Sequence, residues 1–136
     1  MVYKVIGLMS GSSLDGLDVV YTFLEENRGA WKFDIQEAEC IPYTSELTSS
    51  LKNASHLSVA DYLKLDTSYG RFIALQVNAF VERHSLQHKV DFIASHGHTV
   101  FHDPVAFTSR QVGCGATIAA VTGLPVISDL RSMDVA

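Results

Sequence analysis

The chain has 136 residues, of which 47% are hydrophobic and 18% are charged, and its formal net charge is −5. These values indicate one packed domain and exclude a disordered chain, and no apolar run is long enough to span a membrane. The chain is acidic overall and has no stripe of basic residues, which argues against nucleic acid as a binding partner. Its two cysteines, Cys40 and Cys114, are far apart in the sequence, which indicates reduced thiols and a location in the cytoplasm.

Three strands are predicted at the start of the chain. Apolar and β-branched residues place them at 2–9, 17–24 and 31–41, with short polar segments between them. Connections as short as these favour an antiparallel meander at the start of a sheet.

Helical periodicity replaces the strand pattern after residue 42. A short helix is predicted over 45–53, and a longer one begins at the capping-box sequence Ser58–Asp61 and carries one apolar stripe to about His84. Gly70 interrupts this stripe at a cost of about 1 kcal/mol relative to alanine. We interpret the stripe as a face that packs against the sheet rather than as a cofactor surface.

The last third of the chain alternates between strands and a helix. Strands are predicted at 90–95 and 126–128, with 107–112 as a candidate for another, and a helix of small residues over 113–122 ends at Gly123. The sequence therefore predicts an α/β fold whose mixed sheet starts antiparallel and is flanked by helices.

The segment Met9–Asp18 between the first two strands is dense in glycine, serine and aspartate. Glycines let the backbone turn its N–H groups toward an anion, so one hypothesis is a phosphate-binding loop in which Asp15 holds Mg²⁺ through water. The alternative is a tight hairpin whose serine and aspartate side chains cap their own turn. The Gly-Lys-Ser/Thr element of a Walker A loop is missing.

Two segments carry recognisable motifs: Gly7–Asp18 reads G-L-M-S-G-S-S-L-D-G-L-D, and Ser95–Val100 reads S-H-G-H-T-V. The first resembles the opening motif G-L-M-S-G-T-S-L-D-G-x-D of the anhydro-N-acetylmuramic acid kinases, with Ser12 in place of threonine, and the second is similar to the S-H-G-Q-T motif of the same family. Further similar segments follow in the same order: His102–Pro104, Gln111–Gly113, Ile118–Ala119, Thr122–Gly123, Val126–Arg131 and Asp134.

This resemblance implies the N-terminal lobe of an actin-like (ribonuclease H-like) ATPase fold, as in sugar kinases, the Hsp70 ATPase domain and actin. It implies a kinase that uses ATP and Mg²⁺ to open 1,6-anhydro-N-acetylmuramic acid and form N-acetylmuramic acid 6-phosphate, a step in peptidoglycan recycling. The implied phosphate-binding hairpin consists of Gly11, Ser12, Ser13, Leu14, Asp15, Gly16, Leu17 and Asp18.

A second polar segment, Ser95–Thr99, follows a predicted strand. The resemblance supports a sugar-binding edge in which His96 and Thr99 offer donors and acceptors to hydroxyl groups at the carboxyl end of that strand. His98 stands where the family usually has glutamine. A metal site on His96, His98 and His102 is an alternative, although the sequence shows no complete set of ligands for it. Ser95 lacks the G-x-S-x-G motif that typically presents a nucleophilic serine.

A third polar segment, Asp129–Asp134, follows the last predicted strand. Arg131 suits a bidentate contact with a carboxylate, which the lactyl group of the implied sugar would supply. We interpret Asp129 and Asp134 as substrate-shaping or structural, because the base of the family resembles an aspartate in a later F-D-x-G-P-G-N segment. The alternative is an acidic loop whose charges pair internally.

We expect residues 1–136 to form an incomplete N-terminal lobe, because the second lobe and the general base lie in later segments of the family. The chain by itself is then expected to be catalytically inactive. Its expected binding partner is the anhydro sugar substrate. The competing hypothesis is a non-catalytic sugar-binding or interaction module. The sequence leaves a homodimer open.

Overall fold

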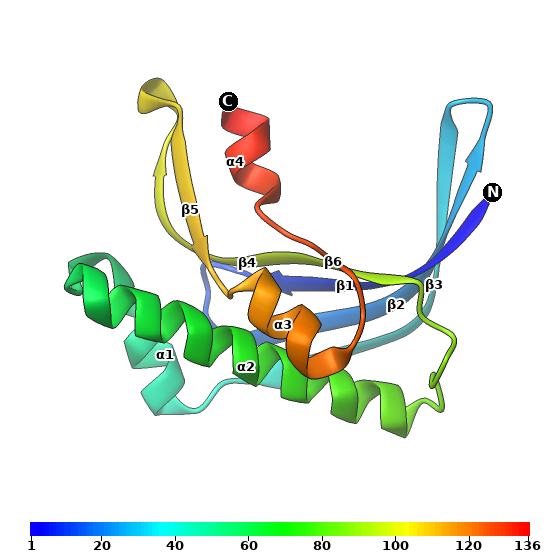
Figure 1. Cartoon of the computed structure of the whole chain (residues 1–136), viewed down its shortest axis with the longest axis horizontal. Coiled ribbons are helices and arrows are strands. Elements are labelled where there is room, and N and C mark those ends of the chain that lie inside the picture. Colours follow the sequence, from blue (N-terminus) through cyan, green and yellow to red (C-terminus); the bar gives the residue numbers. More distant parts are fainter.

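A computed structural model describes all 136 residues of the chain. Six strands form one curved sheet in the order β3-β2-β1-β4-β5, with β6 paired to β4 (Figure 1). Their bounds are β1 Val2–Ser10, β2 Gly16–Asn27, β3 Ala30–Pro42, β4 Phe92–Asp103, β5 Thr108–Val112 and β6 Val126–Ile127. The first three strands are antiparallel neighbours, which confirms the predicted meander.

Strand β4 organises the sheet because it has different partners along its length. Its first half runs parallel to β1 and β6, and its second half pairs antiparallel with β5. The predicted end of this strand at residue 95 is therefore wrong. The strand continues through the histidine segment to Asp103, since β5 supplies hydrogen-bonding partners that the local sequence pattern does not reveal.

Three helices cover one face of the sheet, as Figure 1 shows. They are α1 (Ser45–Lys52), α2 (Val59–Arg83) and α3 (Gly115–Thr122). Short 3₁₀ turns occupy Ala54–His56 and Pro104–Ala106. No helix is both long enough and apolar enough to cross a membrane.

Helix α2 supplies much of the core. Its first turn is capped as predicted, since the backbone N–H of Asp61 donates to Ser58 Oγ at 3.1 Å. The buried side chains of α2 pack with those of the sheet in one cluster that includes Tyr69, Ile73, Val77, Phe80, Ile6, Val19 and Ile93. This packing confirms the interpretation of the apolar stripe.

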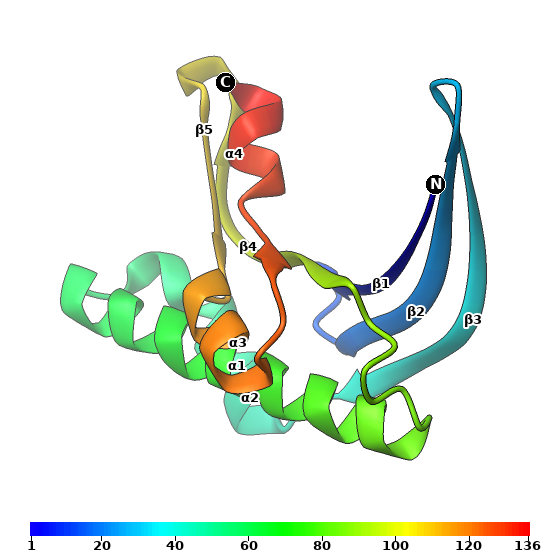
Figure 2. The same cartoon turned by 45° about the vertical axis from the view of Figure 1, so that its right-hand side comes forward.

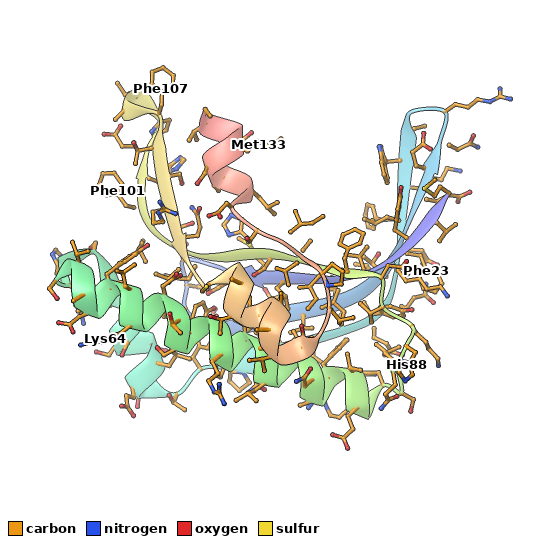
Figure 3. The ribbon with its side chains drawn as sticks, in the orientation of Figure 1. Phe23, Lys64, His88, Phe101, Phe107 and Met133 are labelled. Atoms are coloured by element: carbon orange, nitrogen blue, oxygen red, sulfur yellow. The ribbon has the colours of Figure 1, made fainter.

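The opposite face of the sheet is concave between two long hairpins (Figure 2). One hairpin is β2–β3 and the other is β4–β5, and α4 (Leu130–Val135) stands beside the second. The sequence predicted a polar loop for this last segment, whereas the chain forms a short helix that contacts β5. Phe101, Phe107 and Met133 are exposed at this rim (Figure 3).

Candidate functional site

The polar turn between β1 and β2 lies at the carboxyl end of β1. Strand pairing extends to Ser10 and Leu17, so the turn consists only of Gly11–Asp15 and is shorter than the predicted loop. The N–H of Leu14 donates to the carbonyl of Gly11 at 3.2 Å, and Leu14 has a φ of 56°. Gly16, Leu17 and Asp18 belong to β2, and the Leu17 side chain is buried in the core.

The side chains of this turn remain free to bind a ligand. Ser12, Ser13 and Asp15 are exposed, and none of these side chains makes a hydrogen bond or ion pair within the chain. The hairpin is therefore tight without the side-chain caps that the alternative hypothesis required. A free carboxylate at this position is also a suitable oxygen ligand for Mg²⁺.

A buried chain of hydrogen bonds anchors the start of the turn. His98 Nδ1 lies 3.0 Å from Ser10 Oγ, which also accepts a hydrogen bond from the hydroxyl of Tyr43 at 2.7 Å. The hydroxyls of Tyr43 and Tyr69 are 2.6 Å apart. Residues from β1, β4, α2 and the segment between β3 and α1 thus hold the start of the turn in one position.

The His98 side chain is buried in this hydrogen-bond network and is not a freely exposed sugar contact. Only 6% of its surface is exposed, and burial lowers the pKa of its imidazole. Burial likewise raises the pKa values of Tyr43 and Tyr69. His98 is therefore neutral near pH 7, and its Nδ1 can accept the hydroxyl hydrogen of Ser10.

The turn opens onto a hollow of about 390 Å³, called here the loop hollow. Its polar lining consists of Ser10, Ser12, Lys52, Ser55, His96, His98, Thr99 and Arg131. Two cationic side chains and no carboxylate line it, so its electrostatic character favours an anion.

A second hollow of about 390 Å³ lies at the start of α3 and is called here the α3 hollow. Its polar lining includes Tyr62, Asp66, Ser95, Arg110, Gln111 and Asp129. His96 lines both hollows, and Arg131 Nε lies 3.4 Å from His96 Nε2, to which it donates. The two hollows are therefore neighbours across one imidazole.

The structure brings three segments that are distant in the sequence to one place. Ser12 of the turn and the predicted sugar contacts His96, Thr99 and Arg131 all line the loop hollow. Lys52 also lies there, at the end of α1, and no sequence signal marked it, because a lysine in the last turn of a helix is common.

The remaining predicted residues lie elsewhere. His102 Nδ1 is 3.0 Å from Ser109 Oγ on β5, so the three histidines of β4 do not converge. Asp129 lines the α3 hollow, where it faces Arg110 at 3.8 Å, and Asp134 is exposed in α4.

The fold defines the class of protein. A mixed sheet that starts as an antiparallel meander, continues with parallel strands and carries helices on one face is the N-terminal lobe of an actin-like ATPase. A family model described as anhydro-N-acetylmuramic acid kinase matches residues 3–136. The chain therefore belongs to this kinase family, which confirms both the resemblance and the fold class predicted from the sequence.

Proposed function

We propose that the chain forms one wall of the site at which an ATP-dependent kinase phosphorylates 1,6-anhydro-N-acetylmuramic acid. The observation that carries this proposal is the loop hollow, which Ser12 and Leu14 of the turn line together with two cations and two sugar-contact candidates, namely Lys52, Arg131, His96 and Thr99. Family membership supports the kinase class, and the chemistry of the hollow supports the substrate and cofactor.

The proposed reaction breaks the bond between C1 and O6 of the anhydro ring. Water adds to C1, O6 receives the γ-phosphoryl group of ATP, and N-acetylmuramic acid 6-phosphate and ADP are released. Lys52 and Arg131 stabilise the negative charge of the transferred group, because fixed cations act strongly on the charge of a phosphoryl transition state.

The turn has two roles in this proposal. The hydroxyls of Ser12 and Ser13 and the backbone N–H groups bind phosphate oxygens, and Asp15 holds Mg²⁺ through water. Mg²⁺, when bound, neutralises charge on the phosphates. The buried Ser10–His98 contact keeps the turn in place, so its free donors are oriented before the nucleotide arrives.

The base that activates water is assigned to the second lobe, and residues 1–136 to the N-terminal lobe. No carboxylate lines the loop hollow, which agrees with a carboxylate base supplied by the second lobe. The two free cysteines, Cys40 and Cys114, agree with a reducing compartment and support a cytoplasmic reaction.

The direct test is transfer of radiolabel from γ-labelled ATP to 1,6-anhydro-N-acetylmuramic acid by the product of the intact gene. We expect labelled N-acetylmuramic acid 6-phosphate. If the intact product binds the sugar but transfers no label, the kinase proposal fails and the non-catalytic sugar-binding module replaces it.

Replacing Asp15 by asparagine in the intact product tests the metal role. The amide keeps the size of the side chain but removes its charge, so we expect phosphoryl transfer to fall on the order of 10²-fold while sugar affinity changes little. Glu25→Gln, an exposed change at the far end of β2, is the matched control and should alter neither quantity. Equal losses of transfer and sugar affinity in Asp15→Asn would contradict a phosphate role.

A further inference from the structure

Strand β3 forms an open edge of the sheet. It is the last strand in the order β3-β2-β1-β4-β5, and β2 is its only partner. Figure 2 shows it on the outer side of the hairpin that rises away from the helices. Residues 30–38 of this strand are all exposed. A long exposed edge presents a row of unpaired backbone groups, and proteins usually cover or pair such an edge.

The two halves of β3 differ in what holds them. In the second half, Glu37 and Glu39 contact side chains at the end of α2. In the first half, Ala30–Ile35, the side-chain hydrogen bonds stay within the β2–β3 hairpin. A bulge at Gln36 separates the halves, because this residue has no partner in the register with β2. The first half is therefore a regular strand with one free side.

Hydrogen bonds on the far side of β2 show which backbone groups are free. Glu26 lies opposite Trp31, and its N–H and C=O both bond to Met1 at 2.9 Å. Glu26 and Trp31 are therefore a non-hydrogen-bonded pair of the hairpin. It follows that the N–H and C=O of Trp31 point away from β2, toward the open edge.

The orientation of the backbone groups alternates along the strand. Phe33 and Ile35 therefore point their N–H and C=O groups to the open edge as Trp31 does. The carbonyl of Asp34 points the other way, since it accepts a hydrogen bond from Thr22 Oγ1 on β2 at 3.0 Å. Trp31–Ile35, called here the edge segment, thus presents free donors and acceptors at every second residue.

The residues with free backbone groups also carry an exposed apolar row. Trp31, Phe33 and Ile35 are 60%, 74% and 51% exposed, and their side chains share one face of the strand. The Trp31 ring stacks on Tyr3, with 6.1 Å between the ring centroids. Neighbouring exposed apolar side chains of this size are typical of a surface that binds another chain.

Two charges of opposite sign lie on the other face of the edge segment. Lys32 belongs to no ion pair of the chain. The Asp34 carboxylate accepts one hydrogen bond, from Gln36 Nε2 of the same strand at 2.7 Å. The cation and the anion are two positions apart, so Phe33 lies midway between them.

We propose that the edge segment pairs antiparallel with the edge segment of a second copy of this chain, about a two-fold axis at Phe33. Phe33 then lies opposite Phe33 of the second copy, and Trp31 lies opposite Ile35. The free backbone groups of these residues meet, and each opposite pair exchanges two N–H···O bonds. A two-fold interface needs a patch that is complementary to itself, and the edge segment meets this requirement.

The charges select this register over its neighbours. Lys32 of each copy faces Asp34 of the other at a non-hydrogen-bonded position, where opposite side chains approach most closely. A shift by two residues in either direction places Lys32 opposite Lys32 or Asp34 opposite Asp34, which is destabilising. Lysine on an edge strand usually discourages pairing, and here it discourages the registers that lack an acidic partner.

The pairing leaves the loop hollow open. Strand β2 begins next to the turn Gly11–Asp15 and ends at the hairpin turn that leads into the edge segment, so the two features lie at opposite ends of β2. The dimer is therefore independent of the proposed function. Its formation is measured without ATP or sugar, and loss of the dimer should leave phosphoryl transfer unchanged.

Sedimentation velocity of the intact gene product over a concentration series tests the pairing. We expect a reversible dimer. Lys32→Glu and Asp34→Lys each create two like-charged pairs across the axis, so each should raise the dissociation constant on the order of tenfold to hundredfold. Arg71→Glu, a charge reversal on the exposed side of α2, is the matched control and should leave the dimer unchanged.

Mixing the two single variants tests the register itself. In the mixed pair, every introduced charge faces an opposite charge, so we expect a heterodimer at concentrations at which each variant alone is monomeric. The double variant Lys32→Asp with Asp34→Lys should restore the homodimer for the same reason. Recovery in either form also shows that the substituted chains are folded.

Three results would overturn the inference. The first is an intact product that is monomeric, which would indicate that another segment of the same protein covers β3. The others are a dimer that neither charge reversal weakens, and single variants that do not pair when mixed. If the charge variants fail to fold, Phe33→Pro is decisive, because it removes a backbone N–H that β2 does not use. It should abolish the dimer and leave the circular dichroism spectrum unchanged, and a dimer that persists in it would also refute the pairing.

Discussion

At the scale of single residues, His98 decides how the polar turn is held. Its imidazole takes the place usual for glutamine in the family and contacts Ser10 through Nδ1. Because Tyr43 already donates to Ser10 Oγ, the Ser10 hydrogen is available only for an acceptor, which a neutral imidazole provides and an imidazolium does not. Protonation of His98 would therefore break a contact that positions the turn.

The pH dependence of stability tests this arrangement. Burial lowers the folded pKa of His98 below its unfolded value of about 6.5, so its contribution is complete above that pH and is lost as the pH falls toward the folded pKa. We expect the difference in unfolding free energy between the parent chain and His98→Gln to decrease below pH about 6.5, at a limiting slope of about 1.4 kcal/mol per pH unit.

Urea unfolding across this pH range measures the difference. His56→Gln serves as the control, because it makes the same substitution at an exposed histidine. A difference for His98→Gln that does not vary with pH would mean that the imidazole is not held neutral by the fold.

At the scale of elements, the crossing of α2 and α3 depends on Gly70. The sequence marks this glycine only as a weak point of a helix, with a cost of about 1 kcal/mol relative to alanine. In the fold, a Cβ at Gly70 would lie 2.9 Å from both the backbone nitrogen and the backbone oxygen of Cys114. Close approach of the two helices therefore requires glycine at this position.

Gly70→Ala should consequently destabilise the chain although alanine is the better helix former. Overpacking of this kind costs about 1–3 kcal/mol, and contact with backbone atoms favours the upper part of that range. After the propensity gain, we expect a net loss of about 1–2 kcal/mol in unfolding free energy, measured by urea denaturation. Ser68→Ala, on the exposed face of the same helix, should instead gain about 0.5 kcal/mol, and a gain for Gly70→Ala would show that the helices can separate without cost.

At the scale of the whole molecule, a polar cluster ties the edge of the sheet to the helical layer. Glu39 on β3 accepts hydrogen bonds from Arg83 at the end of α2 and lies 2.7 Å from His84 Nε2. His84 Nδ1 is 3.2 Å from Glu37 on the same strand. These contacts join the outer strand of the meander to the end of the long helix.

Lowering the pH should weaken the contacts of Glu39 with Arg83 and His84. The hydrogen bonds from Arg83 and His84 lower the pKa of Glu39, so its contribution is present above the ordinary carboxyl pKa and is lost as the pH falls through the folded value. We expect Glu39→Gln to reduce stability at pH 7 and to differ less from the parent chain below pH about 4. Denaturant unfolding at both pH values checks this, with Glu25→Gln as the control, and a difference that persists in acid would assign the effect to packing.

Local patterns predicted most of the elements correctly. The capping box at Ser58 and the glycine at the end of α3, which has a φ of 72° at Gly123, are signals carried by a few neighbouring residues. The extension of β4 to Asp103 and the helix α4 were not predicted. The first depends on pairing with β5. The second follows Asp129, which has a positive φ of 58°, and lies in a polar segment whose sequence is typical of a loop.

By itself, the sequence determined the family, the order of the strands and helices up to β6, and the motifs that carry the phosphate and sugar hypotheses, because each of these is a local pattern of residue types. Only the tertiary structure decided that the turn is Gly11–Asp15, that His98 is buried against Ser10, and that two hollows of opposite charge meet at His96. These features depend on distances between segments far apart in the chain, which residue patterns do not encode.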